Sequence, residues 1–149
     1  MAKFVYRMQN ILNIKLKLED QAKIAYGQAS AKLAEEQQKL QEILVRKAGY
    51  EKKAKELVSG SIRVVDIREN KRAIDTMKSM MRQQMLAVQV AEKNLEAARI
   101  RLNAVMIERK THEKLREHAF EEFQQELVHE ENKVVDELVS YTYHEKEEE

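Results

Sequence analysis

Apolar residues recur at alternating steps of three and four through nearly the whole 149-residue chain, and this spacing limits the folds open to it. Thirteen of sixteen positions are apolar in the first stripe, which runs Phe4, Met8, Ile11, Lys15, Leu18, Ala22, Tyr26, Ala29, Leu33, Glu36, Leu40, Ile43, Lys47, Tyr50, Ala54 and Leu57. Ten of twelve are apolar in the second, which runs Ile67, Asn70, Ile74, Met77, Met81, Gln84, Val88, Ala91, Leu95, Ala98, Leu102 and Val105. Such stripes are typical of the buried seam of a coiled coil.

Both stripes contain an irregularity. Two consecutive four-residue steps around Ala22 form a stutter, which locally unwinds a supercoil. Beyond Val105 the register reaches Arg109, His112 and Arg116, so the second stripe lapses there. Apolar spacing then resumes with Phe120, Phe123, Leu127, Val134, Leu138 and Tyr141.

The chain has almost no residues that break helices, because it contains no proline and three glycines. The one credible break is Ser59-Gly60-Ser61, where glycine can take the left-handed conformation that ends a helix. Asp66 and Glu69 have the spacing of a capping box. We therefore predict a helix over 3–58, a connector over 59–65, a helix over 66–143 and an acidic tail over 144–149 that frays.

Two stripes joined by a short connector are most simply buried against each other. The predicted fold class is all-α: a long antiparallel two-helix coiled-coil hairpin with unequal arms, forming a single domain over 1–149. The end of the second helix would extend beyond the first helix. Its apolar side chains, including Phe120, Phe123 and Leu127, would then lack an intramolecular partner and await another molecule, a fold-back or a dimer.

Charge is distributed unevenly along the chain. Residues 120–149 hold eleven acidic and two basic side chains, and residues 1–119 hold 15 acidic and 25 basic ones. Solvated coiled-coil flanks explain this better than nucleic-acid binding, because the cations are scattered and no aromatics interleave them. The longest apolar run, residues 104–107, has four residues against the roughly 20 of a membrane span. The N-terminus lacks an apolar signal region. We expect a cytoplasmic protein with no direct membrane insertion.

No enzyme chemistry is indicated, and we expect no catalytic residue, metal or cofactor. The chain has no cysteine and no glycine-rich phosphate loop. Glu126 and His129 have the Glu-x-x-His spacing of di-iron bundles, but such a site needs two of these motifs plus two further glutamates. Solvated helix surface is the better interpretation.

Four of the seven methionines cluster early in the second helix. Met77 and Met81 lie on the stripe, where core filling is the favoured interpretation. Met80 and Met85 lie off it, and so do Leu44 and Val45 on the facing arm. With Tyr50 these side chains would make an adaptable docking patch, although scattered surface hydrophobes explain them equally well.

The N-terminal strings Phe4-Val-Tyr-Arg-Met-Gln-Asn-Ile-Leu-Asn-Ile-Lys15 and Glu19-Asp-Gln-Ala-Lys23 resemble the opening of the flagellar export protein family FliJ. The length, the mid-chain break and the charged C-terminal end are also similar to that family. The resemblance implies an antiparallel coiled coil, similar to the central stalk of rotary ATPases, in the flagellar type III export apparatus. Such a stalk inserts in the export ATPase hexamer, promotes its assembly and activity, and contacts the transmembrane export gate and, in some members, export chaperones. It would work at the inner face of the cell membrane.

The resemblance also implies two sets of contact residues. The set for the export gate is Leu40, Leu44, Tyr50, Met77, Met80 and Met81. The set for the ATPase ring is Tyr6, Arg7, Gln9, Phe120, Phe123 and Leu127.

Other hypotheses remain open beside the stalk. A holdase-type or escort chaperone would use the exposed methionines and the acidic overhang to hold export substrates or export chaperones. A basic hairpin binding nucleic acid or anionic lipid ranks last of the binding hypotheses, and its affinity would fall steeply with salt.

Overall fold

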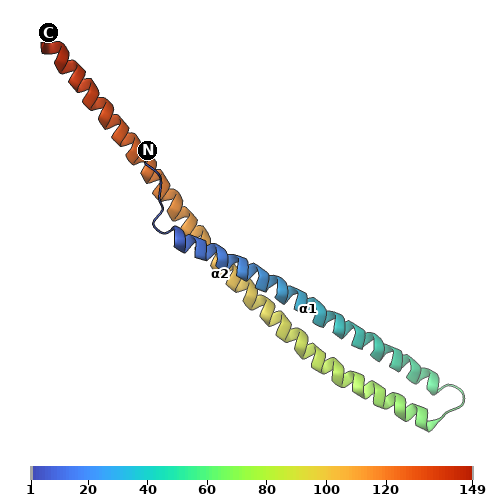
Figure 1. The fold of residues 1–149 in the computed structure, drawn as a ribbon. Helices are drawn as coiled ribbons and strands as arrows, with labels where there is room; N and C mark the ends of the chain where they lie inside the picture. The colour runs from blue at the N-terminus through green and yellow to red at the C-terminus, as the bar shows by residue number, and fades with distance from the viewer. Residues whose placement is uncertain (1, 149) are drawn as a thin grey trace. The chain divides into compact units, whose positions relative to one another are not determined.

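The computed structural model describes residues 2–148, which form two long α-helices that pack against each other (Figure 1). Helix α1 spans Gln9–Leu57 with 49 residues, and α2 spans Val64–Glu148 with 85 residues. The described residues contain no strand. The prediction of an all-α helical hairpin with unequal arms is therefore confirmed.

The two helices are shared between two compact units, each with its own contacts. The connector unit is Asp20–Asn103, which includes the turn between the helices. The terminal unit consists of the described residues of Met1–Glu19 and Ala104–Glu149. The single domain over 1–149 stays a prediction, and the two contact units are described separately below.

In the connector unit, α1 ends at Leu57 and a short turn leads to α2. The backbone N–H and the hydroxyl of Ser59 both donate to the carbonyl of Glu56, at 3.2 and 2.9 Å, and so satisfy one of the last carbonyls of the helix. Gly60 follows with a φ of 92°, in the left-handed region that favours glycine. Helix α2 begins at Val64, two residues before the predicted start, so Asp66 lies within its first turn instead of capping it.

The core of the connector unit lies where the two predicted stripes meet. Its most buried apolar side chains come from both helices: Ala22, Ile43, Met77, Val88 and Ala91. None of the twelve positions of the second stripe is exposed. In the first stripe only Met8, Ile11 and Tyr26 are exposed. The three- and four-residue spacing therefore located the interface between the helices correctly.

In the terminal unit the chain is not helical before Gln9, although the sequence predicted a helix from residue 3. We call residues 2–8 the N-terminal strap. The Phe4 ring packs edge-on against Phe120 with ring centroids 5.1 Å apart, and lies 5.5 Å from Phe123. The Arg116 guanidinium lies 5.6 Å above the Phe4 ring. These aromatic contacts correct the expectation that Phe120 and Phe123 have no intramolecular partner.

Helix α2 extends to Glu148, beyond the predicted end at residue 143. The acidic end that was expected to fray is therefore helical over its described part, and Glu149 lies outside the described residues. Glutamate and lysine are strong helix formers, and this propensity outweighs the repulsion between like charges. The Thr142 hydroxyl also donates to the carbonyl of Leu138 at 2.9 Å within this segment.

Candidate protein-interaction surfaces

Two polar contacts between the helices fix the register of the connector unit. The side-chain amide of Gln84 donates to the Glu36 carbonyl at 2.9 Å and also to the Glu36 carboxylate. The Asn70 amide donates to the Tyr50 carbonyl at 3.0 Å. Residues 36–50 of α1 therefore face residues 70–84 of α2. This register brings the predicted gate residues of both helices into one stretch of the connector unit.

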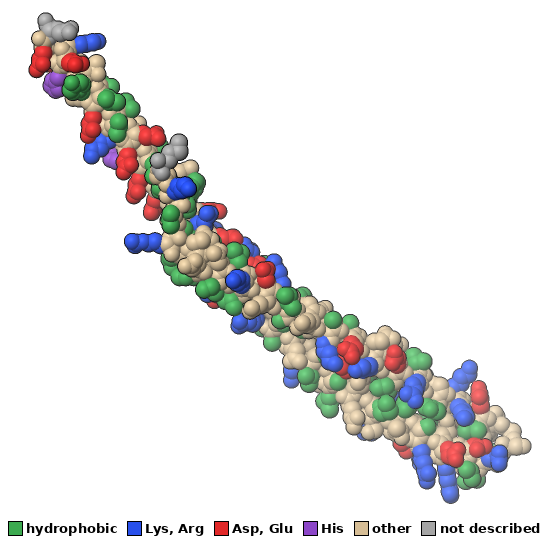
Figure 2. Space-filling view, viewed as in Figure 1, with side chains coloured by type: hydrophobic (Ala, Val, Ile, Leu, Met, Phe, Trp, Pro, Cys, Tyr) green, Lys and Arg blue, Asp and Glu red, His purple; other side chains and the backbone are tan. Residues whose placement is uncertain are grey.

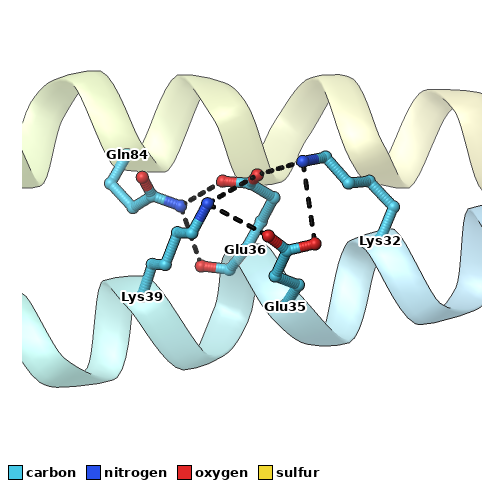
Figure 3. Close-up of polar contacts among 5 residues, drawn as sticks. All are labelled: Lys32, Glu35, Glu36, Lys39 and Gln84. Atoms are coloured by element: carbon cyan, nitrogen blue, oxygen red, sulfur yellow. Dashed lines mark hydrogen bonds and ion pairs between the residues drawn. The ribbon is translucent and has the colours of Figure 1, made fainter.

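Glu36 forms the centre of a charged cluster on this stretch (Figure 3). Its residue is only 7% exposed, yet its carboxylate lies 2.9 Å from the ammonium of Lys32 and 3.7 Å from that of Lys39. Glu35 lies 3.2 Å from Lys39. The hydrogen bonds from Lys32 and then Gln84 lower the pKa of the Glu36 carboxyl, and the bond to Glu36 raises the pKa of Lys32. The seam therefore holds a stably ionised glutamate with donors from both helices.

The predicted gate residues differ widely in exposure. Met77 is 4% exposed and belongs to the core, whereas Met80 is 36% exposed. Leu44 is also exposed, and Leu40, Tyr50 and Met81 are half-buried. Of the six, Leu44 and Met80 offer the most accessible side chains, and Val45 and Met85 are exposed in the same facing stretches.

The predicted ring residues gather in the terminal unit. Arg7 and Phe120 are exposed, and the other four are half-buried: Tyr6, Gln9, Phe123 and Leu127. The side-chain amide oxygen of Gln9 accepts from the Arg116 guanidinium at 2.9 Å, and this contact attaches the start of α1 to α2. The buried Tyr6 hydroxyl has no hydrogen-bond partner among the described residues.

Where the second stripe lapses, charged side chains make the contacts between the two helices. Arg109 donates to the buried Glu19 at 2.5 Å and to Glu113 at 2.9 Å, while Lys15 pairs with Glu108 at 2.8 Å. The bond to Glu19 raises the pKa of Arg109. The sequence pattern alone did not identify the pairs Arg109–Glu19 and Lys15–Glu108, because their members lie 90 and 93 positions apart and only the fold brings them together.

Beyond Leu127 helix α2 has no segment of α1 against it in the terminal unit, and it carries an exposed apolar stripe. Figure 2 shows apolar side chains beside acidic ones on this arm. The exposed members are Val128, Val134, Val135, Leu138, Val139, Tyr141 and Tyr143. The sequence pattern had singled out Val134, Leu138 and Tyr141. Continued helical periodicity on the adjacent positions would have added Val128, Val135 and Val139.

A second exposed apolar group lies at the turn between the helices. Val58, Ile62, Val64 and Val65 are 58–65% exposed, and we call these four residues the connector tip. The sequence pattern missed them because they fall off both stripes. The sequence feature that could have identified them is the run Ile62-Arg-Val-Val65, because it lies beside a turn, where polar residues are usual.

No group of three or more potential metal-ligating side chains occurs among the described residues. Glu126 and His129 lie on the exposed surface of α2. Within residues 2–148 neither helix is apolar over a stretch long enough to cross a membrane.

Comparison with known protein families shows to which family this chain belongs. The family model described as Flagellar FliJ protein matches residues 4–148. The chain belongs to the FliJ family. The match confirms the resemblance of the N-terminal strings and extends it over both helices and the connector. FliJ membership makes the chain a component of flagellar protein export. No solved structure and no curated protein sequence shows a significant match to the chain.

Proposed function

We propose that the chain is a non-enzymatic central stalk of the flagellar export apparatus. It inserts in the export ATPase hexamer, promotes the assembly and activity of that ring, and links it to the transmembrane export gate. The observation that carries this proposal is the family match over residues 4–148, on a chain that consists of two long helices. The chain need contribute no catalytic group, because ATP hydrolysis would belong to the ring.

The ring contact is assigned to the terminal unit. Exposed Arg7 and half-buried Leu127 are available to a partner there, while Phe4 and Phe120 hold the strap against α2. A stalk bound inside a ring contacts it through side chains of several chemical types. Aromatic, basic and acidic side chains all occur within this unit.

The ring assignment is tested by adding the purified chain to the cognate export ATPase. We expect faster ATP turnover and more hexamer by sedimentation. The paired change Arg7→Glu and Leu127→Asp should reduce both effects, whereas Val90→Asp, on the exposed surface of the connector unit, should not. Turnover and assembly that do not respond to the wild-type chain would exclude the stalk function.

The gate contact is assigned to the stretch around Met80 in the connector unit. Replacing Tyr50 and Met80 with aspartate should weaken binding to the soluble domain of the gate protein and leave helix content by circular dichroism unchanged, because neither side chain is fully buried. Equal binding by the double variant would remove this surface from the proposal.

A holdase-type or escort chaperone is the second candidate, and the exposed stripe from Val128 to Tyr143 is the observation that favours it. Such a protein would bind several unrelated unfolded export substrates, or the export chaperones, without the ATPase. A stalk would bind one ATPase and show no general affinity for unfolded chains.

A further inference from the structure

The connector tip exposes more apolar surface than a turn in water requires. Four β-branched aliphatic side chains, each 58–65% exposed, occur within eight residues of chain. Ser59 already satisfies the carbonyl of Glu56, and Gly60 accounts for the reversal of the chain. The turn geometry therefore does not explain why Val58, Ile62, Val64 and Val65 are apolar.

Basic side chains outnumber acidic ones in the stretch of chain that contains the tip. Residues 52–72 hold seven basic and three acidic side chains, and all seven basic residues are exposed. These are Lys52, Lys53, Lys55, Arg63, Arg68, Lys71 and Arg72. Arg63 is drawn only weakly to Asp66, with 3.9 Å between the nearest atoms, so its side chain remains available. An apolar centre with a basic rim is the composition of peptides that bind at the surface of anionic membranes.

We propose that the connector tip docks on an anionic lipid bilayer. The four aliphatic side chains enter the boundary between headgroups and acyl chains, and the surrounding Lys and Arg side chains contact the lipid phosphates. This contact is shallow and requires no helix to cross the membrane. The sequence-based expectation of no direct membrane insertion is the competing outcome, which the vesicle experiments below decide.

Charge and shape favour a bilayer over a protein occupant. The four side chains sit on a chain reversal, and a Cβ built on Gly60 meets no atom within 4 Å, so the tip is open on that side. A second copy of the tip would bring two cationic rims together and is disfavoured by their repulsion. A fluid anionic surface complements both the apolar centre and the basic rim.

The absence of tryptophan from the chain makes a direct test possible. In the full-length variant Ile62→Trp the indole is the lone tryptophan reporter, placed at the tip. With vesicles of phosphatidylcholine containing about a third phosphatidylglycerol, its emission should shift to the blue and should be quenched by lipids brominated on the acyl chain. The matched variant Val90→Trp places the reporter on an equally exposed position of α2 and should show neither effect. Pure phosphatidylcholine vesicles should bind at least tenfold more weakly, because they lack the charge that attracts the rim.

A second pair of variants separates insertion from simple charge attraction. Ile62→Asn with Val65→Asn removes apolar surface without changing the charge and should reduce vesicle binding of the otherwise wild-type chain by at least tenfold, whereas Val90→Asn should not. The proposal is overturned if the wild-type chain does not bind the anionic vesicles, or if the tip variant binds as well as wild type. It is also overturned if the tip variant loses only binding to the gate protein, which would make the tip a protein contact. The vesicles contain neither ATPase nor gate protein, so a failure here leaves the stalk proposal intact.

Discussion

Shortening Met77 to alanine tests whether the stripe of α2 stabilises the hairpin through burial. Met77 is 4% exposed, so the substitution removes Cγ, Sδ and Cε from an environment shielded from water. At about 0.8 kcal/mol for each methylene-sized group, the loss is about 2.4 kcal/mol. The higher helix propensity of alanine returns a few tenths of this. We therefore expect the free energy of unfolding to fall by about 2 kcal/mol.

Urea denaturation followed by circular dichroism measures this change. With a slope of about 2 kcal/mol per molar urea, the midpoint should fall by about 1 M. The matched control is Met80→Ala, which removes the same atoms from a side chain that is 36% exposed and should change the free energy by less than about 1 kcal/mol. Equal shifts for the two variants would refute the assignment of Met77 to the core and Met80 to the surface.

Three further predictions concern the connector, the charged seam and the strap. Gly60→Ala should destabilise the chain by about 1–2 kcal/mol in urea denaturation, because the φ of Gly60 is 92°. The control Gly49→Ala lies in a helix, with no atom within 4 Å of the added Cβ, and should stabilise the chain by about 0.5–1 kcal/mol. Changes of the same sign in the two variants would contradict this reasoning. The pKa of Glu36 is lowered on folding, so its ionised form contributes stability above its usual value of 4.5 and loses that contribution as the pH falls through the lower folded value. The urea midpoint of Glu36→Gln should therefore lie below that of wild type at neutral pH and approach it as the pH is lowered below 4.5, and a gap independent of pH would count against an ionic role. Phe4→Ala removes ring contacts worth about 0.5–1.5 kcal/mol and should speed amide hydrogen exchange several-fold at Gln9, whose N–H donates to the Tyr6 carbonyl, with helix content unchanged. Unaltered exchange at Gln9 would mean that these contacts do not hold the strap.

The seam of the connector unit was predictable because helix geometry fixes which positions share a face. Val88, Ala91 and Met77 could be assigned to the interface from spacing alone, and the structure places all three among the buried residues. The chain reversal was also predictable, because Gly60 lies in the one short segment rich in helix-breaking residues. The seam and the chain reversal depend on residues close together in the sequence, and these residues were sufficient to predict both.

Features that depend on contacts between distant residues were not predictable. Arg109 looked like a lapse in the stripe because its partner, Glu19, lies 90 positions away. Phe4 fits a helical stripe as well as it fits a strap, and only its contacts with Phe120 and Phe123 distinguish the two. The exposed connector tip was missed for another reason, since Val64 and Val65 follow neither stripe and their exposure becomes visible only once the turn is built.

The contact between Gln84 and Glu36 has a mechanical consequence for the connector unit. Sliding one helix past the other by a turn, about 5.4 Å, would carry the Gln84 amide away from both Glu36 oxygens that it serves. The half-buried Gln84 amide would then lose both of its acceptors at once, and such a loss is costly. The Asn70 amide bound to the Tyr50 carbonyl adds the same resistance elsewhere along the seam. These contacts resist sliding between the two helices of this unit. A force applied along one helix is therefore transmitted to the other, and the two helices move together.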